Sequence, residues 1–367
     1  MNSHKRVCKA LNQENTDRVP VDFGGTIVSS ITKGAYNKLK NYKGLVGEAE
    51  LIDIVQGLVE PPENLKEEYN CDFKRISLNP ADSWELKIEE NKFEDEFGIV
   101  RRKAGPYYDI VGFPLKDADL ADLEKYDWPD PGDPGRTRGL SQKARTISQE
   151  TDYVIIADMI SGGLFEQALR MRGYEKFFLD LGLNKKFAHA LLDKLLEVYL
   201  GLYEHYIEAV GDYVTIFALA DDLGTQQNLM ISPAMYREFI KPRHKILYNY
   251  IKEKSDGAYI FHHSCGAIFP LIGDLIDVGV DIIQSVQTSA KGMNISRLAK
   301  EYGGDISFFG AIDVQQDLPN KSPAEITEIV LKTIEVLGKN GGYILSPSHN
   351  IQADTPPENV EALFKAI

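Results

Sequence analysis

Short apolar runs alternate with longer amphipathic stretches along most of this chain. Each run is continuously apolar, which is typical of strands in a parallel sheet, because such strands are buried on both faces. The expected strands are residues 19–23, 153–157, 213–220, 258–261, 281–286, 306–312 and 343–345. The expected helices between them include residues 185–210, 233–254, 268–278 and 323–337.

Repeated strand–helix units of this kind predict a parallel α/β fold. About seven units fit a (β/α)8 TIM barrel better than an open doubly wound sheet, and the chain carries neither a GxGxxG motif nor a Walker loop. Polar residues follow the strands at their carboxyl ends, the face at which barrel enzymes assemble their sites. We therefore expect residues 1–367 to form one TIM-barrel domain.

One region, approximately residues 84–139, departs from this rhythm. The sequences WELKIEE and IVRRKAG flank the turn-rich segment NKFEDEFG within residues 84–105, a pattern that predicts a β-hairpin. Residues 128–139 (WPDPGDPGRTRG) are rich in Pro and Gly, which indicates a long connection. We expect the hairpin to be inserted in the first third of the barrel.

Composition narrows the class of protein. The 367 residues carry a formal charge of −14, and an acidic surface repels phosphate, so we expect neither a nucleic acid nor an anionic membrane as partner. No apolar run approaches the about 20 residues that cross a bilayer, and the first 20 residues lack the apolar core of a secretory signal. Three cysteines do not build a disulfide framework. These features predict a cytoplasmic protein, and we expect an enzyme.

The strongest local signal for chemistry is the segment FHHSCG, residues 261–266. Alternate side chains of a strand share a face, so His263 and Cys265 project together while His262 points away. Imidazole and thiolate suit a borderline-soft metal such as zinc, and His349, after the last expected strand, would reach the same barrel face. Three protein ligands and an open position are typical of catalytic zinc. The alternative is that these residues pack in the barrel and bind no metal.

Five further polar residues follow expected strands. Asp221 and Asp222 could polarise a substrate, take a proton or complete the zinc shell; alternatively, one of them caps the following turn. Gln287 and Asp313 are candidates for substrate binding. Glu166 could also face the cavity, or it could simply start a helix, where Glu is favourable.

With these residues in place, the chain resembles the uroporphyrinogen decarboxylase superfamily, which includes the decarboxylases and zinc-dependent methyltransferases that work with corrinoid proteins. The resemblance spans nearly the whole chain and is specific to the superfamily, but much less specific to the reaction. The segments that carry it are KALNQENTDRVPVDFGG, DDLGTQ, SPAMYREFIKP, HHSCGAIFPLIGDLIDVGVDIIQSVQ and SPSHNIQADTPPENV.

The two branches of the superfamily imply different sites. Decarboxylases are expected to carry an Arg-rich segment soon after the first strand, whereas residues 23–34 (FGGTIVSSITKG) contain no arginine. A tetrapyrrole with eight carboxylates needs cationic partners, so this absence argues against a porphyrinogen, although His349 matches a histidine of the decarboxylases. The methyltransferases are expected to hold zinc through a His, a nearby Cys and a later Cys. His263 and Cys265 match, and His349 would replace the later Cys.

The resemblance implies a methyltransferase that moves a methyl group from a small methylated substrate, such as a methoxylated aromatic, to a corrinoid protein, with zinc as Lewis acid. The chain lacks the DxHxxG motif expected of a corrinoid-carrying domain, so the corrinoid would sit on a separate partner protein. Two alternatives remain: a decarboxylase of porphyrinogens, and a binding protein without catalysis on the same barrel.

Overall fold

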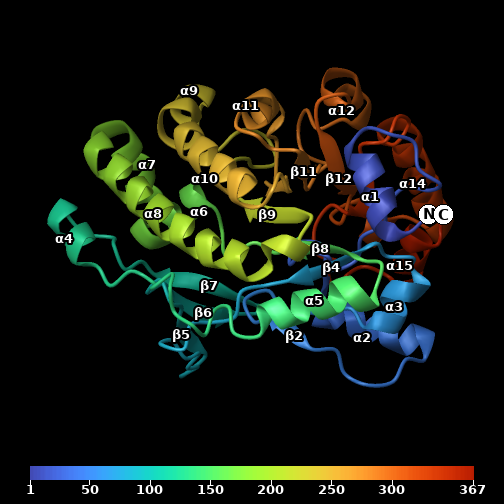
Figure 1. Cartoon of the computed structure of the whole chain (residues 1–367), viewed down its shortest axis with the longest axis horizontal. Helices are drawn as coiled ribbons and strands as arrows, with labels where there is room; N and C mark the ends of the chain where they lie inside the picture. The colour runs from blue at the N-terminus through green and yellow to red at the C-terminus, as the bar shows by residue number, and fades with distance from the viewer.

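A curled parallel sheet forms the centre of the molecule in the computed structural model, which describes residues 1–367 (Figure 1). Seven strands hydrogen-bond in the order β13-β12-β11-β10-β9-β8-β4. Their bounds are β4 (Phe73–Ile76), β8 (Val154–Ala157), β9 (Ile216–Ala220), β10 (Tyr259–His263), β11 (Ile282–Gln284), β12 (Ser307–Ile312) and β13 (Tyr343–Pro347).

The segment of residues 20–22 closes this sheet into a barrel. Val21 forms a parallel bridge with Leu345 of β13, and the Asp22 N–H donates to the Leu345 carbonyl oxygen at 2.9 Å. On the other side, the Asp72 N–H, directly before β4, donates to the Val21 carbonyl oxygen at 2.8 Å. The segment therefore takes the eighth strand position between β13 and β4, and the predicted TIM barrel is confirmed.

The barrel strands bury both of their faces. One set of side chains, including Phe261, Phe309 and Ile344, forms a separate core of 12 buried residues that draws on most of the strands. The other set packs against the surrounding helices in a core of 81 buried residues. Burial on both sides explains why most of these strands are continuously apolar in sequence.

Helices surround the sheet. They are α1 (Ser3–Leu11), α2 (Lys33–Lys43), α3 (Glu63–Glu68), α4 (Leu120–Lys125), α5 (Leu140–Glu150), α6 (Leu164–Arg172), α7 (Tyr174–Leu183), α8 (Lys185–Val210), α9 (Pro233–Met235), α10 (Lys241–Lys254), α11 (Ile272–Asp277), α12 (Ile295–Tyr302), α13 (Asp317–Asn320), α14 (Pro323–Leu337) and α15 (Pro357–Phe364). Short 3₁₀ turns cover Gly211–Tyr213 and Phe269–Leu271. None of the helices combines the length and the hydropathy that a bilayer crossing requires.

Two of the expected helices, α8 and α14, have the predicted bounds, whereas the one expected over residues 233–254 is interrupted. A π-helical turn, Tyr236–Ile240, separates α9 from α10. Pro242 lies at the start of α10 and has no N–H to donate to the carbonyl four residues earlier, so the regular hydrogen-bond ladder is broken there.

Two small antiparallel sheets are separate from the barrel sheet. The strands β1 (Ile31–Thr32), β3 (Leu58–Val59) and β2 (Leu51–Asp53) form one small sheet, in that order. A second sheet, with the order β5-β6-β7, is made by β5 (Lys92–Glu94), β6 (Val100–Ala104) and β7 (Tyr107–Gly112), within the predicted insertion. This inserted sheet lies on the opposite side of the view from α14 and α15 (Figure 1).

The inserted sheet differs from the predicted two-stranded hairpin. Residues 84–90 were expected to form its first strand but form none, and β7 pairs with β6 instead. A two-residue turn joins β6 to β7, and Gly105 in this turn has φ of +62°, a conformation that glycine adopts without steric cost. The sequence Gly105-Pro106 is a turn signal that the hairpin interpretation overlooked.

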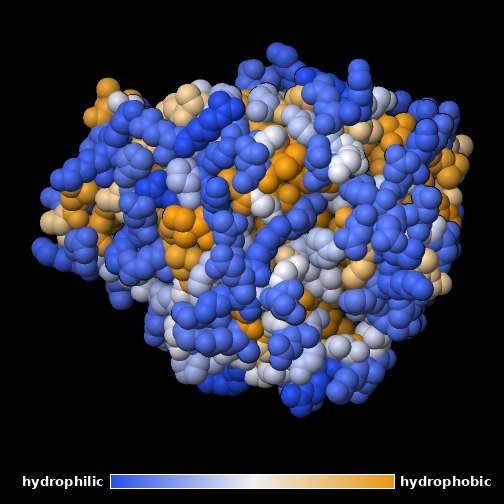
Figure 2. Space-filling view, turned by 45° about the horizontal axis from the view of Figure 1, so that its top comes forward, coloured by the Kyte–Doolittle hydropathy of each residue, from blue (hydrophilic) through white to orange (hydrophobic).

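Hydrophilic residues dominate the face shown in Figure 2, and hydrophobic side chains gather there in separate small groups. This distribution agrees with the formal charge of −14. Because ligand sites are usually concave and partly apolar, we expect the functional site in a cavity and not on this polar surface.

Candidate metal centre

Three side chains that the sequence singles out meet at the carboxyl ends of the barrel strands. His263 ends β10, Cys265 follows it by two residues, and His349 follows β13. Their ligand atoms all lie within 4.8 Å of one another. The Cys265 Sγ is 3.6 Å from His263 Nε2, and the rings of the two histidines are 5.4 Å apart between centroids.

The pleat of β10 separates the two neighbouring histidines. His262 is fully buried on the helix side of the strand, where its Nδ1 is 2.8 Å from the Tyr248 hydroxyl of α10 and its ring packs edge-on against His244. His263 lies on the opposite face, toward Cys265 and His349. The structure therefore places these side chains as strand alternation predicts.

Gln284 of β11 orients the His263 ring. The Gln284 side-chain amide donates to the Ser348 carbonyl oxygen at 3.2 Å, which leaves its Oε1 as the atom that contacts His263 Nδ1. An oxygen can only accept, so His263 Nδ1 carries the proton and Nε2 presents its lone pair on the side of Cys265. Metal-binding histidines usually donate the N–H of their other ring nitrogen to an acceptor such as this one.

The donor set fits zinc. Tetrahedral zinc with ordinary Zn–N and Zn–S bonds separates a bound nitrogen from a bound sulfur by about 3.6 Å, and the His263 Nε2 to Cys265 Sγ distance is 3.6 Å. Burial, together with the neighbouring His263, lowers the pKa of His349 to about 4, so His349 is the neutral imidazole that a metal requires. Burial raises the pKa of the Cys265 thiol, and a bound cation would reverse that shift.

His349 is less prepared for a metal than the other two residues. The backbone N–H of Asn350 donates to His349 Nδ1 at 2.8 Å, so the proton of the neutral ring lies on Nε2. A metal bond through Nε2 would require this proton to move and the contact with Asn350 to break. His263 and Cys265 are therefore better preorganised for metal binding than His349.

The two neighbouring aspartates have different surroundings. Asp221 is fully buried, and its carboxylate accepts the N–H groups of Phe165 and Glu166 at the start of α6 and contacts His244 Nε2 at 3.0 Å. It caps α6 and does not line the cavity described below. Asp222 does line it: its Oδ1 accepts the Cys265 N–H at 2.8 Å and lies 3.6 Å from His263 Nε2.

Gln287 and Asp313 follow β11 and β12, as expected, and their side chains contact backbone N–H groups of nearby loops. The Gln287 Oε1 accepts the Gly266 N–H at 2.8 Å, and Asp313 accepts the N–H groups of Gln315 and Gln316 in the turn after β12. Neither residue lines the cavity. Substrate binding by these two residues stays a prediction, because in the structure their side chains already accept backbone N–H groups of the loops.

A cavity of about 490 Å³ opens beside the donor set and is lined by Asp222, His263 and His349. Glu166, in the first turn of α6, also lines it and pairs with Arg170 one turn later. The pKa of Glu166 is raised to about 7, chiefly by burial and also by the nearby Asp222 charge, although Arg170 opposes the shift. A carboxyl group with this pKa can hold a proton at neutral pH and give it up.

Comparison with known proteins now identifies the family. Residues 107–367 match the model of the family described as Uroporphyrinogen decarboxylase (URO-D). The chain belongs to the URO-D family. The match runs from β7 of the inserted sheet to the last helix, which takes in the barrel strands β8 to β13, and it includes all three candidate metal ligands.

Two relatives in this family are named Uroporphyrinogen decarboxylase. One, from Trichodesmium erythraeum, is 28% identical over 177 residues, which cover 48% of this chain and 46% of the relative. The other, from Hydrogenobaculum sp., is 24% identical over 184 residues, which cover 50% of this chain and 49% of the relative. The chain thus spans about half the length of the curated relatives it matches.

A solved structure with the same fold is a methyltransferase from Methanosarcina mazei. Its TM-score is 0.66 at 18% sequence identity, and the match covers 100% of this URO-D chain and 98% of the other chain. At this identity the likeness establishes the fold, and the reaction must be argued from the site.

Residues that sequence analysis missed make up much of the cavity wall of this URO-D protein. Arg75 lies in β4, whose sequence FKRI carries two charges and therefore does not resemble a buried strand. Arg101 lies in the inserted sheet, where no strand end pointed to it. Asp158 was visible as the polar end of a predicted strand, and that signal could have identified it. The missed charged residues of the wall are Asp53, Arg75, Asp95, Arg101, Asp158 and Arg170.

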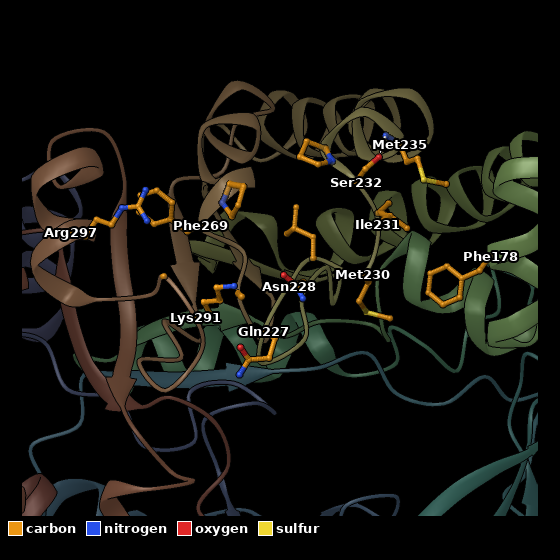
Figure 3. Close-up of a pocket in the computed structure, with 15 residues that line it drawn as sticks. Phe178, Gln227, Asn228, Met230, Ile231, Ser232, Met235, Phe269, Lys291 and Arg297 are labelled. Carbon is orange, nitrogen blue, oxygen red and sulfur yellow. Dashed lines mark hydrogen bonds between the residues drawn. The ribbon is translucent and has the colours of Figure 1, made fainter.

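A second cavity, of about 790 Å³, is lined in part by Ala267 of the loop that carries Cys265. Figure 3 shows Phe178 at one end of this cavity and Phe269, against which Arg297 stacks, at the other. Met230 and Ile231 lie between them. This cavity contains none of the candidate ligands, so the chemistry is assigned to the smaller cavity.

Proposed function

We propose that this URO-D protein is a methyltransferase that takes a methyl group from a small methylated substrate, such as a methoxylated aromatic, and passes it to a corrinoid carried by a separate partner protein. The observation that carries the proposal is the set of three ligand atoms of His263, Cys265 and His349, all within 4.8 Å, beside a cavity large enough for a small molecule. Two imidazoles and one thiolate suit zinc, and the incomplete protein coordination leaves room for a substrate atom.

The reaction breaks a methyl–oxygen bond and forms a methyl–cobalt bond, with the electron pair supplied by Co(I) of the corrinoid. Zinc, when bound, supplies a Lewis acid that stabilises negative charge on the leaving oxygen. His263 would bind it through Nε2 because Gln284 holds the ring in the correct tautomer. The leaving oxygen also needs a proton, which this chain can provide from its own residues.

Glu166 is our candidate for the proton donor. It lines the same cavity as the donor set, and its pKa of about 7 keeps a substantial protonated fraction at neutral pH. Asp222 is placed to position the substrate and the Cys265 loop, because its carboxylate accepts the Cys265 N–H. Asp221 acts through α6: it holds the N–H groups from which Glu166 projects.

A porphyrinogen decarboxylase is the second candidate, since the curated relatives carry that name. The charge of the cavity disfavours it. Three arginines stand against five carboxyl groups in the wall, and Arg75 is already engaged by Glu60 and Asp158. A substrate with eight carboxylates would need a surplus of cationic partners.

Metal analysis and a methyl-transfer assay test the proposal together. We expect about one zinc per chain, and zinc-dependent methylation of cob(I)alamin, followed by its absorbance, with 4-methoxybenzoate as donor. Loss of carboxyl groups from uroporphyrinogen without any requirement for zinc would establish the decarboxylase instead. Stoichiometric absence of zinc after growth with ample metal would favour a binding protein without catalysis.

A further inference from the structure

Two arginines from different parts of the chain face the same cavity as the donor set. Arg101 belongs to β6 of the inserted sheet and Arg170 to α6, and both line the wall that also contains His263 and His349. Their side chains are largely enclosed, with exposed fractions of 11% and 22%. Guanidinium groups in such a place are costly unless their N–H groups find acceptors.

The protein itself supplies few acceptors for these two side chains. Arg101 donates only from Nε, to Asp95 at 3.4 Å, and Arg170 makes one pair, with Glu166. Arg75 in the same wall shows the contrast, because Glu60, Ser77 and Asp158 together accept from all three of its nitrogens. Arg101 and Arg170 therefore keep terminal N–H groups open to the cavity.

The two guanidinium groups of this pair carry like charges and lie near each other. Burial lowers the pKa of Arg101, and the like charge of Arg170 lowers it further. The nearby carboxylates of Asp53 and Asp95 offset part of this charge, but both also accept backbone N–H groups, Asp53 from Gln56 and Asp95 from residues 97 and 99. They are held by their own loops, and neither forms a bidentate pair with Arg101.

Apolar side chains line the same cavity beside the polar ones. Trp84, Leu86 and Phe93 of the insertion line it together with Met159 and Ile160, which follow β8. Aromatic and aliphatic walls suit a flat apolar ligand, and the arginines suit one planar anionic group on it.

We propose that Arg101 and Arg170 bind the carboxylate of the substrate, so that the methyl donor is a methoxylated aromatic acid with its methoxy group toward the metal ligands. Arg170 pairs with Glu166, the charge of Asp222 acts on Glu166, and Asp222 Oδ1 lies 3.6 Å from His263 Nε2. We call the part of the cavity wall around Arg101 and Arg170 the arginine end, and the part around His263 and His349 the metal end. This assignment rests on the proposed function for the donor, and its binding step can be measured without methyl transfer.

Calorimetric binding of two probes tests the assignment: 4-methoxybenzoate, and 4-methoxybenzyl alcohol, which lacks the charge. Charge-assisted hydrogen bonds to arginine make the acid bind about 10- to 100-fold more tightly than the alcohol in the wild-type protein. Arg101→Met removes most of this preference and leaves the affinity for the alcohol nearly unchanged. Arg101→Lys restores part of it, because Lys keeps the charge but loses the bidentate geometry.

Arg102→Met is the matched control, since Arg102 is the exposed neighbour of Arg101 on β6 and does not line the cavity. It retains the preference for the acid. Equal affinity of both probes for the wild-type protein, no measurable binding of the acid, or equal losses in the Arg101 and Arg102 variants would overturn the assignment. Thermal melting of each variant identifies a misfolded one, and Arg101→Lys then carries the test.

The failures of the two proposals are distinguishable. If methyl transfer to cob(I)alamin proceeds equally well from the acid and the alcohol, the carboxylate subsite is wrong. The proposal of a methyltransferase is then unaffected. Preferential binding of the acid without methyl transfer from any donor sinks the methyltransferase and leaves the subsite intact.

Discussion

The two ends of the central cavity are built in different ways. At the metal end, the ligands follow barrel strands and have second contacts, such as Gln284 on His263 and Asp222 on the Cys265 N–H. At the other end, Arg101 belongs to an inserted sheet and has a single contact of 3.4 Å within the protein. The comparison teaches that the barrel holds the candidate metal ligands in place through second contacts, whereas the insertion leaves the N–H groups of Arg101 mostly without protein acceptors.

The largest effect is expected at the metal end, from Cys265→Ala. Removing the thiolate should abolish most zinc binding and slow methyl transfer by about 1,000-fold, because a Lewis acid contributes several kcal/mol to the transition state. His263→Ala should do the same. Elemental analysis and the cob(I)alamin assay measure both effects.

Cys8→Ala is the control for these variants, because Cys8 lies in α1, away from the donor set. It should retain zinc and rate. Full zinc occupancy in both the Cys265 and the His263 variants would refute the ligand assignment and remove the difference between the two ends.

A smaller loss should follow from Gln284→Leu, which keeps all three ligands. Loss of the partner that orients a metal-binding histidine typically costs about 10- to 100-fold in metal affinity. Gln284→Glu retains an acceptor for His263 Nδ1 and should lose less. Competition with a zinc chelator measures the affinities, and equal losses in the Leu and Glu variants would contradict the orienting role.

Glu166 lies between the two ends and predicts a pH dependence. Its pKa is raised from 4.5 to about 7, so the protonated form persists in the folded protein up to neutral pH. The methyl-transfer rate should therefore fall as pH rises above 7, by about tenfold per pH unit. Glu166→Gln should lower the rate and flatten this limb of the pH–rate profile.

The same shift makes a statement about stability. A carboxyl group whose folded pKa is raised binds its proton more tightly in the folded state, so the free energy of unfolding should decrease as pH rises from about 4.5 to about 7. Glu166→Gln should remove that contribution in denaturant titrations at several pH values. If the pH–rate profile of the Glu166→Gln variant still falls above pH 7, another group supplies the proton for methyl transfer.

The smallest effect is expected at Asp313, which belongs to neither end. Asp313→Ala should reduce the free energy of unfolding by about 1 kcal/mol, because two turn N–H groups lose their acceptor. The KM for the methyl donor should stay within about twofold, since no transition-state or substrate contact is lost. A tenfold rise in KM would return Asp313 to the substrate site.

Much of the metal end could be predicted from the sequence, because parallel strands bring their carboxyl ends to one face. That rule alone brought together His263, Cys265 and His349, which are up to 86 positions apart in the chain. It could not distinguish the roles of Asp221 and Asp222. These roles depend on the partners that the fold brings to each residue: α6 for Asp221 and the Cys265 loop for Asp222.

The arginine end could not be predicted in the same way. Arg101 reaches the cavity through an antiparallel sheet whose strand pairing the sequence did not reveal, and Arg75 sits in a strand interrupted by charges. Gln284 was missed because its role depends on one contact with a residue 21 positions away. The local sequence pattern indicates which residues are buried and whether they form a helix or a strand. Which side chains contact each other depends on the assembled fold.

The closure of the barrel by residues 20–22 has a consequence for synthesis of the protein. These residues leave the ribosome more than 300 residues before Leu345, with which they pair, a delay of tens of seconds at ordinary elongation rates. Until then the segment of residues 20–22 lacks its β13 neighbour and exposes unpaired backbone groups. A nascent chain stalled before β13 would carry that open edge, and we expect chaperones to engage it there.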